Sequence, residues 1–164
     1  YMIVYNQEEI DRISKVKETN DKLEEFFNLK REEWTKNITP LFDALKDNFT
    51  LTNSNKIIDV QALSLTYRQM LSEQISFMLN KRSKEEIKLK KLKQDKFIFY
   101  ATGFGLKTNM GEKSILIDGH ISENDRNIQL IENYVDFLRS CSKNLESLGY
   151  TIKNIIELMN YLGK

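Results

Sequence analysis

Residues 59–99, DVQALSLTYRQMLSEQISFMLNKRSKEEIKLKKLKQDKFIF, contain neither glycine nor proline. This stretch fits one helix of up to about 60 Å, at the helical rise of about 1.5 Å per residue. The whole chain of 164 residues has only one proline and six glycines. A many-stranded sheet usually has more of these turn-forming residues between its strands. The sequence therefore predicts a mainly α fold, with a long helix and helical hairpins.

Helical signals also lie on both sides of this stretch. Residues 7–36 place apolar side chains at mostly helical spacing, interrupted at Asn20, and predict an amphipathic helix. Pro40 then opens a second short helix, PLFDALKD, which is followed by a polar loop. Residues 127–163 predict two helices split at Gly149, a residue that suits the left-handed position after a helix end, with Thr151 as the next cap.

A short β-hairpin is expected near residues 114–121. The segment SILIDGHIS has the β-branched character of a strand pair, with Asp118 and Gly119 at its turn. His120 would then be a turn residue.

A heptad-like seam runs along the long helix. Two interpretations stand: several chains meet through this seam with its polar groups paired, or the seam packs inside one kinked chain. The first predicts a ring-like homo-oligomer larger than a dimer, held also by the apolar face of the last helix. The seam consists of Leu71, Ile75, Met78, Arg82, Glu85, Leu89, Leu92, Lys96 and Phe99. The residues assigned to oligomerisation are Leu71, Ile75, Met78, Leu89, Leu92, Ile152, Ile155, Ile156 and Met159.

The positive charge of the chain is concentrated in residues 81–96. This segment has eight basic and three acidic side chains, whereas the formal net charge of the whole chain is +1. Such concentration is typical of a binding surface for a polyanion. The alternative is a solvated helix face, neutralised in part by the pairs Glu85–Lys88 and Glu86–Lys90.

Aromatic side chains follow the lysines directly, in the sequence KFIFY. Lysines that hold phosphates beside rings that stack on bases are the combination found in single-strand binding proteins. Tyr100 is the preferred stacking ring, since it lies next to a glycine-containing loop where a ring can be partly exposed. The assigned DNA-binding residues are Lys81, Lys84, Lys88, Lys90, Lys91, Lys93, Lys96 and Tyr100.

The sequence gives little support for a catalytic or cofactor site. His120 is the only histidine and Cys141 the only cysteine, so zinc clusters and Cys-His or Ser-His systems lack parts. Neither GFG nor MGEKS has the spacing of a phosphate-binding loop. The sequence predicts a protein that is not an enzyme and holds no metal or other cofactor. No run approaches eighteen apolar residues, and a cytosolic protein without a membrane partner is expected.

The order of four segments resembles the phage recombination mediators of the UvsY family. These segments are LFDALKDNF, LTYRQMLSEQISFMLNKRSKEEIKLKK, DKFIFYATG and NYVDFLRSCSKNLESLGYTIKNIIEL. The resemblance covers residues 41–164 and implies a mediator domain there, preceded by an N-terminal helical extension, residues 1–40. Lys96 falls on one of the family's DNA-contacting positions, while Gln94 stands at another, where Lys91 or Lys93 would substitute.

The resemblance implies a loader without enzymatic activity. Family members bind single-stranded DNA, form ring-like homo-oligomers, and help a RecA-type recombinase (UvsX-like) displace the single-strand-binding protein. A hexamer or heptamer in the cytoplasm of the infected bacterial host is the corresponding expectation. The alternative is a helical assembly or scaffold protein with no nucleic-acid role, and a double-strand DNA-binding protein is a weaker third hypothesis because no recognition-helix arrangement is visible.

Overall fold

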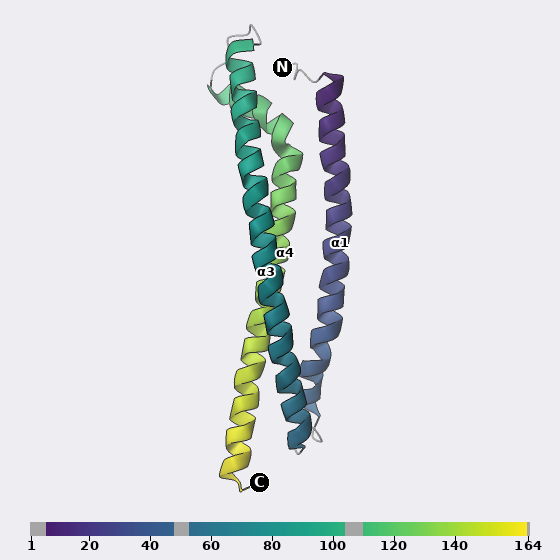
Figure 1. Cartoon of the computed structure of the whole chain (residues 1–164), viewed down its shortest axis with the longest axis vertical. Helices are drawn as coiled ribbons and strands as arrows, with labels where there is room; N and C mark the ends of the chain where they lie inside the picture. Colours follow the sequence, from purple (N-terminus) through teal and green to yellow (C-terminus); the bar gives the residue numbers. More distant parts are fainter. Residues whose placement is uncertain (1–5, 48–52, 104–109, 164) are drawn as a thin grey trace. The chain divides into compact units, whose positions relative to one another are not determined.

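The structure is a computed structural model, which describes residues 6–47, 53–103 and 110–163. Three long helices account for most of these residues: α1 (Gln7–Lys46), α3 (Ser54–Ile98) and α4 (Met110–Tyr161) (Figure 1). A π-helical turn, η1 (Phe99–Gly103), follows α3 directly. No strand occurs in the described ranges, so the predicted mainly α fold is confirmed.

Asparagine side chains cap two of the helices. Asn6 Oδ1 accepts a hydrogen bond of 2.8 Å from the backbone N–H of Glu9 at the start of α1. Asn53 Oδ1 accepts from the N–H groups of Asn55 and Lys56 at the start of α3. These caps satisfy backbone donors that have no partner within the helix.

The chain divides into two compact units, and each long helix contributes to both. Unit 1 comprises Tyr1–Phe27 and Leu79–Asn133, and unit 2 comprises Asn28–Met78 and Tyr134–Lys164. The boundary expected between residues 40 and 41 lies inside α1. No end of a helix therefore marks it.

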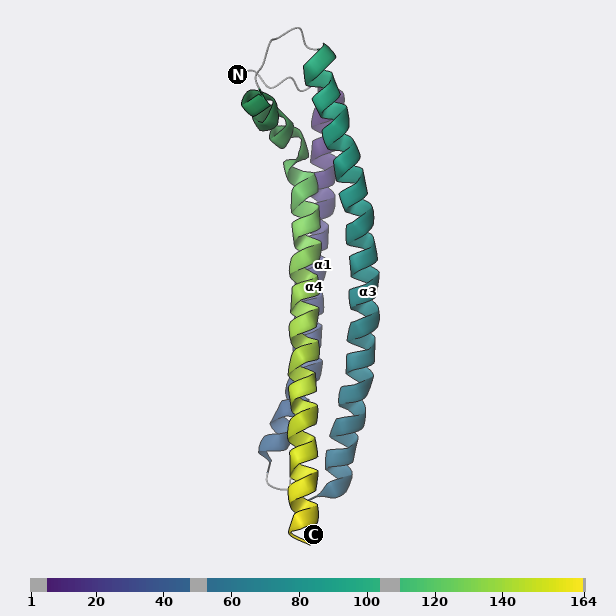
Figure 2. The ribbon, with the colours of Figure 1, turned by 90° about the vertical axis from the view of Figure 1, so that its left-hand side faces the viewer.

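The core of unit 1 joins α3 to α4. Leu89 packs with Ile121 and Ile128, and Leu92 and Ile117 pack against this cluster. Figure 2 shows the first turns of α4 lying at an angle to the turns that follow them in unit 1. Ion pairs add a connection from α4 to α1, because Arg126 contacts Asp21 at 2.9 Å and Glu24 at 2.7 Å.

The core of unit 2 is centred on aromatic side chains. Trp34 of α1 packs edge-on against Tyr67 of α3, with ring centroids 5.9 Å apart. Gln74 Oε1 accepts hydrogen bonds of 3.2 Å from both Trp34 Nε1 and Tyr134 Oη. Gln74 thus links the three helices of this unit while it satisfies two largely buried donors.

Two expected helix boundaries are wrong. Pro40 lies inside α1, which continues to Lys46, and the buried side chains of Ile38 and Leu41 account for this continuation. Gly149 lies inside α4, where Leu145, Leu148 and Ile152 are buried at spacings of three and four residues. Burial on one helical face therefore outweighs the local preference of proline and glycine to end a helix.

The expected hairpin near residues 114–121 is also wrong, since α4 covers this segment. Leu116, His120 and Ile121 are its buried residues, a helical pattern and not the alternation of a strand. Thr151 is likewise no cap, because its hydroxyl donates to the carbonyl of Ser147 within α4.

Candidate functional site

The assigned lysines lie on the part of α3 that belongs to unit 1. Lys81 and Lys96 are partly buried, and the exposed ones are Lys84, Lys88, Lys90, Lys91 and Lys93. We call these five exposed residues the α3 lysine face. An ammonium group in water is free to exchange a weak intramolecular partner for an external phosphate.

Local ion pairs cover only part of the α3 lysine face. Lys88 Nζ lies 3.4 Å from Glu85 Oε1, which confirms the first of the two expected pairs. Glu86 instead contacts Arg82, at 3.4 Å. Because exposed pairs of this kind contribute at most about 1 kcal/mol, the Glu85–Lys88 pair does not prevent an external anion from binding.

Lys96 has a different environment from the exposed lysines. Its Nζ lies 3.2 Å from Glu9 Oε2, and only 21% of its side chain is exposed. The Lys96 ammonium group therefore forms an ion pair with a carboxylate of α1. A phosphate that approached Lys96 would have to compete with this carboxylate.

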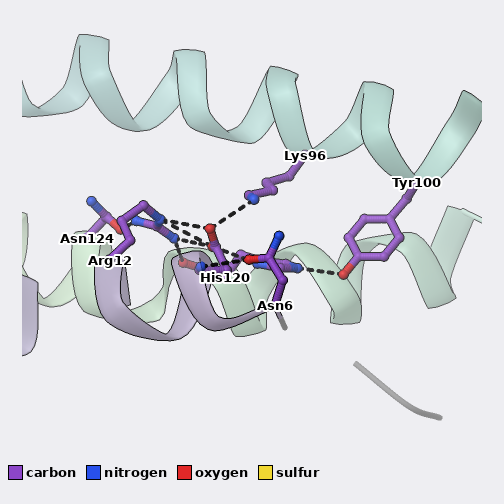
Figure 3. A network of polar contacts seen from close by, with 7 residues as sticks. Asn6, Arg12, Lys96, Tyr100, His120 and Asn124 are labelled. Carbon is purple, nitrogen blue, oxygen red and sulfur yellow. Dashed lines mark hydrogen bonds and ion pairs between the residues drawn. The ribbon is translucent and has the colours of Figure 1, made fainter. Parts of the chain in front are cut away.

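A polar network in unit 1 includes Arg12, Lys96, Tyr100 and His120 (Figure 3), and the Glu9 carboxylate contacts the first two and His120. One of its oxygens, Oε1, accepts hydrogen bonds from Arg12 Nη2 at 2.6 Å and from His120 Nδ1 at 2.8 Å. Arg12 reaches further to α4, donating to the carbonyl of His120 at 2.7 Å and to Asn124 Oδ1 at 3.1 Å. Through these contacts a single carboxylate joins α1, α3 and α4.

Tyr100 closes the other side of this network. Its hydroxyl lies 2.5 Å from His120 Nε2, and its side chain is only 2% exposed. Because the Glu9 carboxylate can only accept, His120 donates through Nδ1 and accepts from Tyr100 through Nε2. The expectation of a partly exposed Tyr100 ring is therefore wrong, and His120 is a buried helix residue and not a turn residue.

Two members of the network have shifted pKa values. Burial would raise the pKa of Glu9, but hydrogen bonds from Arg12, His120 and Lys96 lower it to about 2. Burial lowers the pKa of His120 below its usual value, against the opposing hydrogen bond to Glu9. Near neutral pH Glu9 is thus a carboxylate and His120 a neutral imidazole.

Burial limits the access of a substrate to this network. A Tyr-His-Glu chain resembles an activated nucleophile in its connectivity, but a nucleophile must reach its substrate, and Tyr100 and His120 are each 2% exposed. Cys141 is also buried, and burial raises the pKa of its thiol. Among the described residues no group of three or more His, Cys, Asp or Glu side chains is placed to hold a metal ion.

Exposed aromatic rings occur beside Tyr100. Phe97 and Phe99 are 41% and 40% exposed. Phe97 lines a groove between the end of α3 and the start of α4, together with Lys93 and Lys113. The Lys113 ammonium lies 5.7 Å from the centre of the Phe97 ring, a cation–π contact. Phe97 is therefore better placed than Tyr100 to contact an external base.

The heptad-like seam packs within the chain. In unit 2, Leu71 and Met78 are 0% and 9% exposed, and in unit 1 Leu89 is 8% exposed. Ile75 and Leu92 are partly buried, as are Ile155, Ile156 and Met159, while Ile152 is 0% exposed. The described chain itself therefore covers Leu71, Met78, Leu89 and Ile152. Assignment of the seam to contacts between chains stays a prediction, which the burial of these side chains does not favour.

Sequence reasoning missed the partners of His120 and Lys96. Glu9 and His120 are separated by 111 positions, and no local pattern connects an acidic residue in a first helical turn to a lone histidine so far away. The sequence offers only an indirect signal, a single histidine close to Ile117 and Ile121.

Comparisons with protein-family models, with curated proteins and with solved structures found no match to this chain. No helix in the described part of the chain is long and apolar enough to cross a membrane.

Proposed function

We propose that this protein binds single-stranded DNA through the α3 lysine face and acts as a recombination mediator. The observation that carries the proposal is the exposure of five lysines within one short segment of α3. Each bound phosphate releases condensed counterions, so a run of exposed ammonium groups favours a polyanion over a single small anion. The resemblance of the segment order to that of the UvsY family supports the mediator role.

The proposed partners follow from this role. Single-stranded DNA is the ligand, a RecA-type recombinase is the protein that is loaded, and the single-strand-binding protein is displaced. Hydrolysis of ATP belongs to the recombinase in this scheme. We also propose a homo-oligomer, whose contacts involve exposed apolar side chains and not the buried seam.

A second candidate function is a helical assembly protein with no nucleic-acid role. Exposed apolar side chains on α3 favour it, since Met70 and Phe77 are 44% and 66% exposed. In that case the α3 lysine face would only keep an assembly soluble.

Fluorescence anisotropy with single- and double-stranded oligonucleotides, at two salt concentrations, separates the two candidates. We expect tighter binding to single strands, and the triple variant Lys84→Ala/Lys88→Ala/Lys91→Ala should flatten the log–log salt slope by roughly 2. The same variant should lose the ability to shorten the recombinase lag on strands coated with single-strand-binding protein.

The matched control removes three exposed lysines elsewhere, in Lys17→Ala/Lys143→Ala/Lys153→Ala. It should bind as the unchanged protein does. If both triple variants weaken DNA binding equally, the loss of affinity comes from the change in net charge and not from the α3 lysine face. Equal affinity for single and double strands would contradict the proposal.

A further inference from the structure

Unit 1 has another groove besides the one that Phe97 lines. It is lined by lysines and lies at the N-terminal end of the α3 lysine face. Its walls come from α1 and α3, with Asn124 and Asn127 of α4 also lining it. Three lysines reach it: Lys15 and Lys22 from α1 and Lys81 from α3. We call it the α1–α3 groove. None of its α1 residues was assigned a role from the sequence.

The charge of the groove favours an anionic occupant. Glu85 is its one acidic lining residue, and Glu85 already contacts Lys88 at 3.4 Å. Lys22 contacts Glu18 at 3.3 Å, but the two side chains are 76% and 69% exposed. Water screens such a pair strongly, so Lys22 can turn to a phosphate at little cost.

The floor of the groove is apolar. Val16, Leu23 and Phe26 line it between the lysines, and the Phe26 side chain is 46% exposed. Phe26 also lies beside Phe27, with ring centroids 6.0 Å apart. Ammonium groups around an exposed aromatic ring suit a strand whose phosphates and base faces are both accessible.

The groove and the α3 lysine face lie along the same side of α3. Lys81 lines the groove, and Lys84, Lys88 and Lys91 follow it at spacings of three, four and three residues. Residues at such spacings lie along one side of a helix. A strand that follows these lysines toward the N-terminus of α3 therefore arrives at the groove.

We propose that the α1–α3 groove is a second single-strand DNA contact, in which Lys15, Lys22 and Lys81 hold phosphates and Phe26 stacks on a base. This inference rests on the proposed function and gives α1 a direct part in it. A double helix is a poor occupant, because its bases are stacked on each other and offer no free face to Phe26.

The test compares two double variants of α1 by salt-dependent anisotropy with a single-stranded oligonucleotide. Lys15→Ala/Lys22→Ala should weaken binding and flatten the log–log salt slope by roughly 1.4, at about 0.7 for each lost phosphate contact. Lys17→Ala/Lys36→Ala removes the same charge from exposed positions of the same helix outside the groove. It should leave the slope unchanged.

Phe26 is tested separately. Phe26→Ala should weaken single-strand binding roughly 5- to 150-fold with little change in salt slope, whereas Leu29→Ala, at another exposed apolar position of α1, should not weaken it. In Phe26→Trp the added indole emission should be quenched by the single strand. The chain's own Trp34 is 4% exposed and serves as the background.

The outcomes separate this inference from the proposed function. If the α3 lysine variant weakens binding but Lys15→Ala/Lys22→Ala matches its control, the groove is not a DNA contact and the function stands. If the unchanged protein shows no preference for single strands, both proposals fail. Displacement of the strand by polyglutamate at equal charge concentration would assign the groove to an acidic polypeptide instead. Circular dichroism of each variant must match that of the unchanged protein.

Discussion

At the scale of single residues, the Glu9 carboxylate connects the three helices of unit 1. This carboxylate is 11% exposed and contacts Arg12, Lys96 and His120, which lie on three different helices. Removing one member of such a network leaves the others buried without their partners, which costs more than the network contributed. The same contacts explain why Lys96 and Tyr100 are poorly available to a strand. Both side chains hold the fold together.

The network predicts that acid destabilises the protein in two steps. Unfolded His120 takes up a proton near pH 6.5 but the folded form resists it, so stability falls as pH drops below 6.5. Folded Glu9 has a pKa of about 2 against 4.5 when unfolded, so its contribution is present above pH 4.5 and is lost between pH 4.5 and 2. Urea unfolding at pH 6.5, 5.5, 4.5 and 3.5 measures both steps.

Two substitutions make the acid experiment specific. Since His120 is the only histidine, a loss of stability between pH 6.5 and 5.5 reports on that residue. Glu9→Gln should lose less stability than the unchanged protein between pH 4.5 and 3.5, while Glu8→Gln, one position away and exposed, should lose as much. A stability that is flat from pH 6.5 to 5.5 would contradict the role of buried His120.

At the scale of elements, long-range burial decides where helices end. The α3 helix was predictable because residues 59–99 lack glycine and proline, and the structure extends it to Ser54–Ile98. Pro40, the Asp118-Gly119 pair and Gly149 each carry a local signal for a turn, yet all lie inside helices. The buried residues around them sit on one helical face, and this packing depends on partners that a local pattern does not identify.

The candidate site divides in the same way between what the sequence indicated and what it did not. The lysines of residues 84–93 were predictable, because exposure of a charged side chain is the default. The burial of Tyr100 and the role of Lys96 were not, because both depend on contacts with Glu9 and His120, which lie far away in the sequence. The burial of Leu71 and Leu89 was not predictable either, because a local pattern does not give the positions of α1 and α4.

The continuous α4 helix predicts that Gly149→Ala stabilises the protein. An added Cβ at this position meets no atom within 4 Å, and alanine is favoured over glycine inside a helix by roughly 0.5–1 kcal/mol. Thermal unfolding should show a higher midpoint. As a contrast, Gly163→Ala should not stabilise, because Gly163 has a φ of 74°. A lower midpoint for Gly149→Ala would contradict this prediction and would favour a helix that ends at a left-handed Gly149, as the sequence suggested.

At the scale of the whole molecule, net charge and exposed apolar side chains bear on the proposed homo-oligomer. The chain has a net charge of only +1, despite the α3 lysine face. Exposed apolar side chains occur on all three long helices, among them Leu29, Phe77 and Leu158. Single exposed apolar residues are ordinary. A regular row of them along one helix needs a different explanation, because it repeats with the period that coiled-coil contacts use.

Leu63, Met70 and Phe77 form such a row on α3 in unit 2. They recur every seven residues and are 41%, 44% and 66% exposed. Each directly precedes one of the buried residues Ser64, Leu71 and Met78. The row therefore lies about 100° around the helix from the buried side, where it remains accessible to a second copy of the chain.

This row predicts a homo-oligomer that a single charge disrupts. Phe77→Glu would place a carboxylate in an apolar contact without a partner, which is strongly unfavourable, so light scattering at micromolar concentration should show smaller particles. Leu65→Glu adds the same charge at an exposed position on the opposite flank of the buried side and should leave the particle size unchanged. If the unchanged protein is a monomer, homo-oligomerisation is no longer part of the proposal.

The affinity of Phe77→Glu for single strands should also fall together with its particle size, because linked copies of the α3 lysine face bind one strand together.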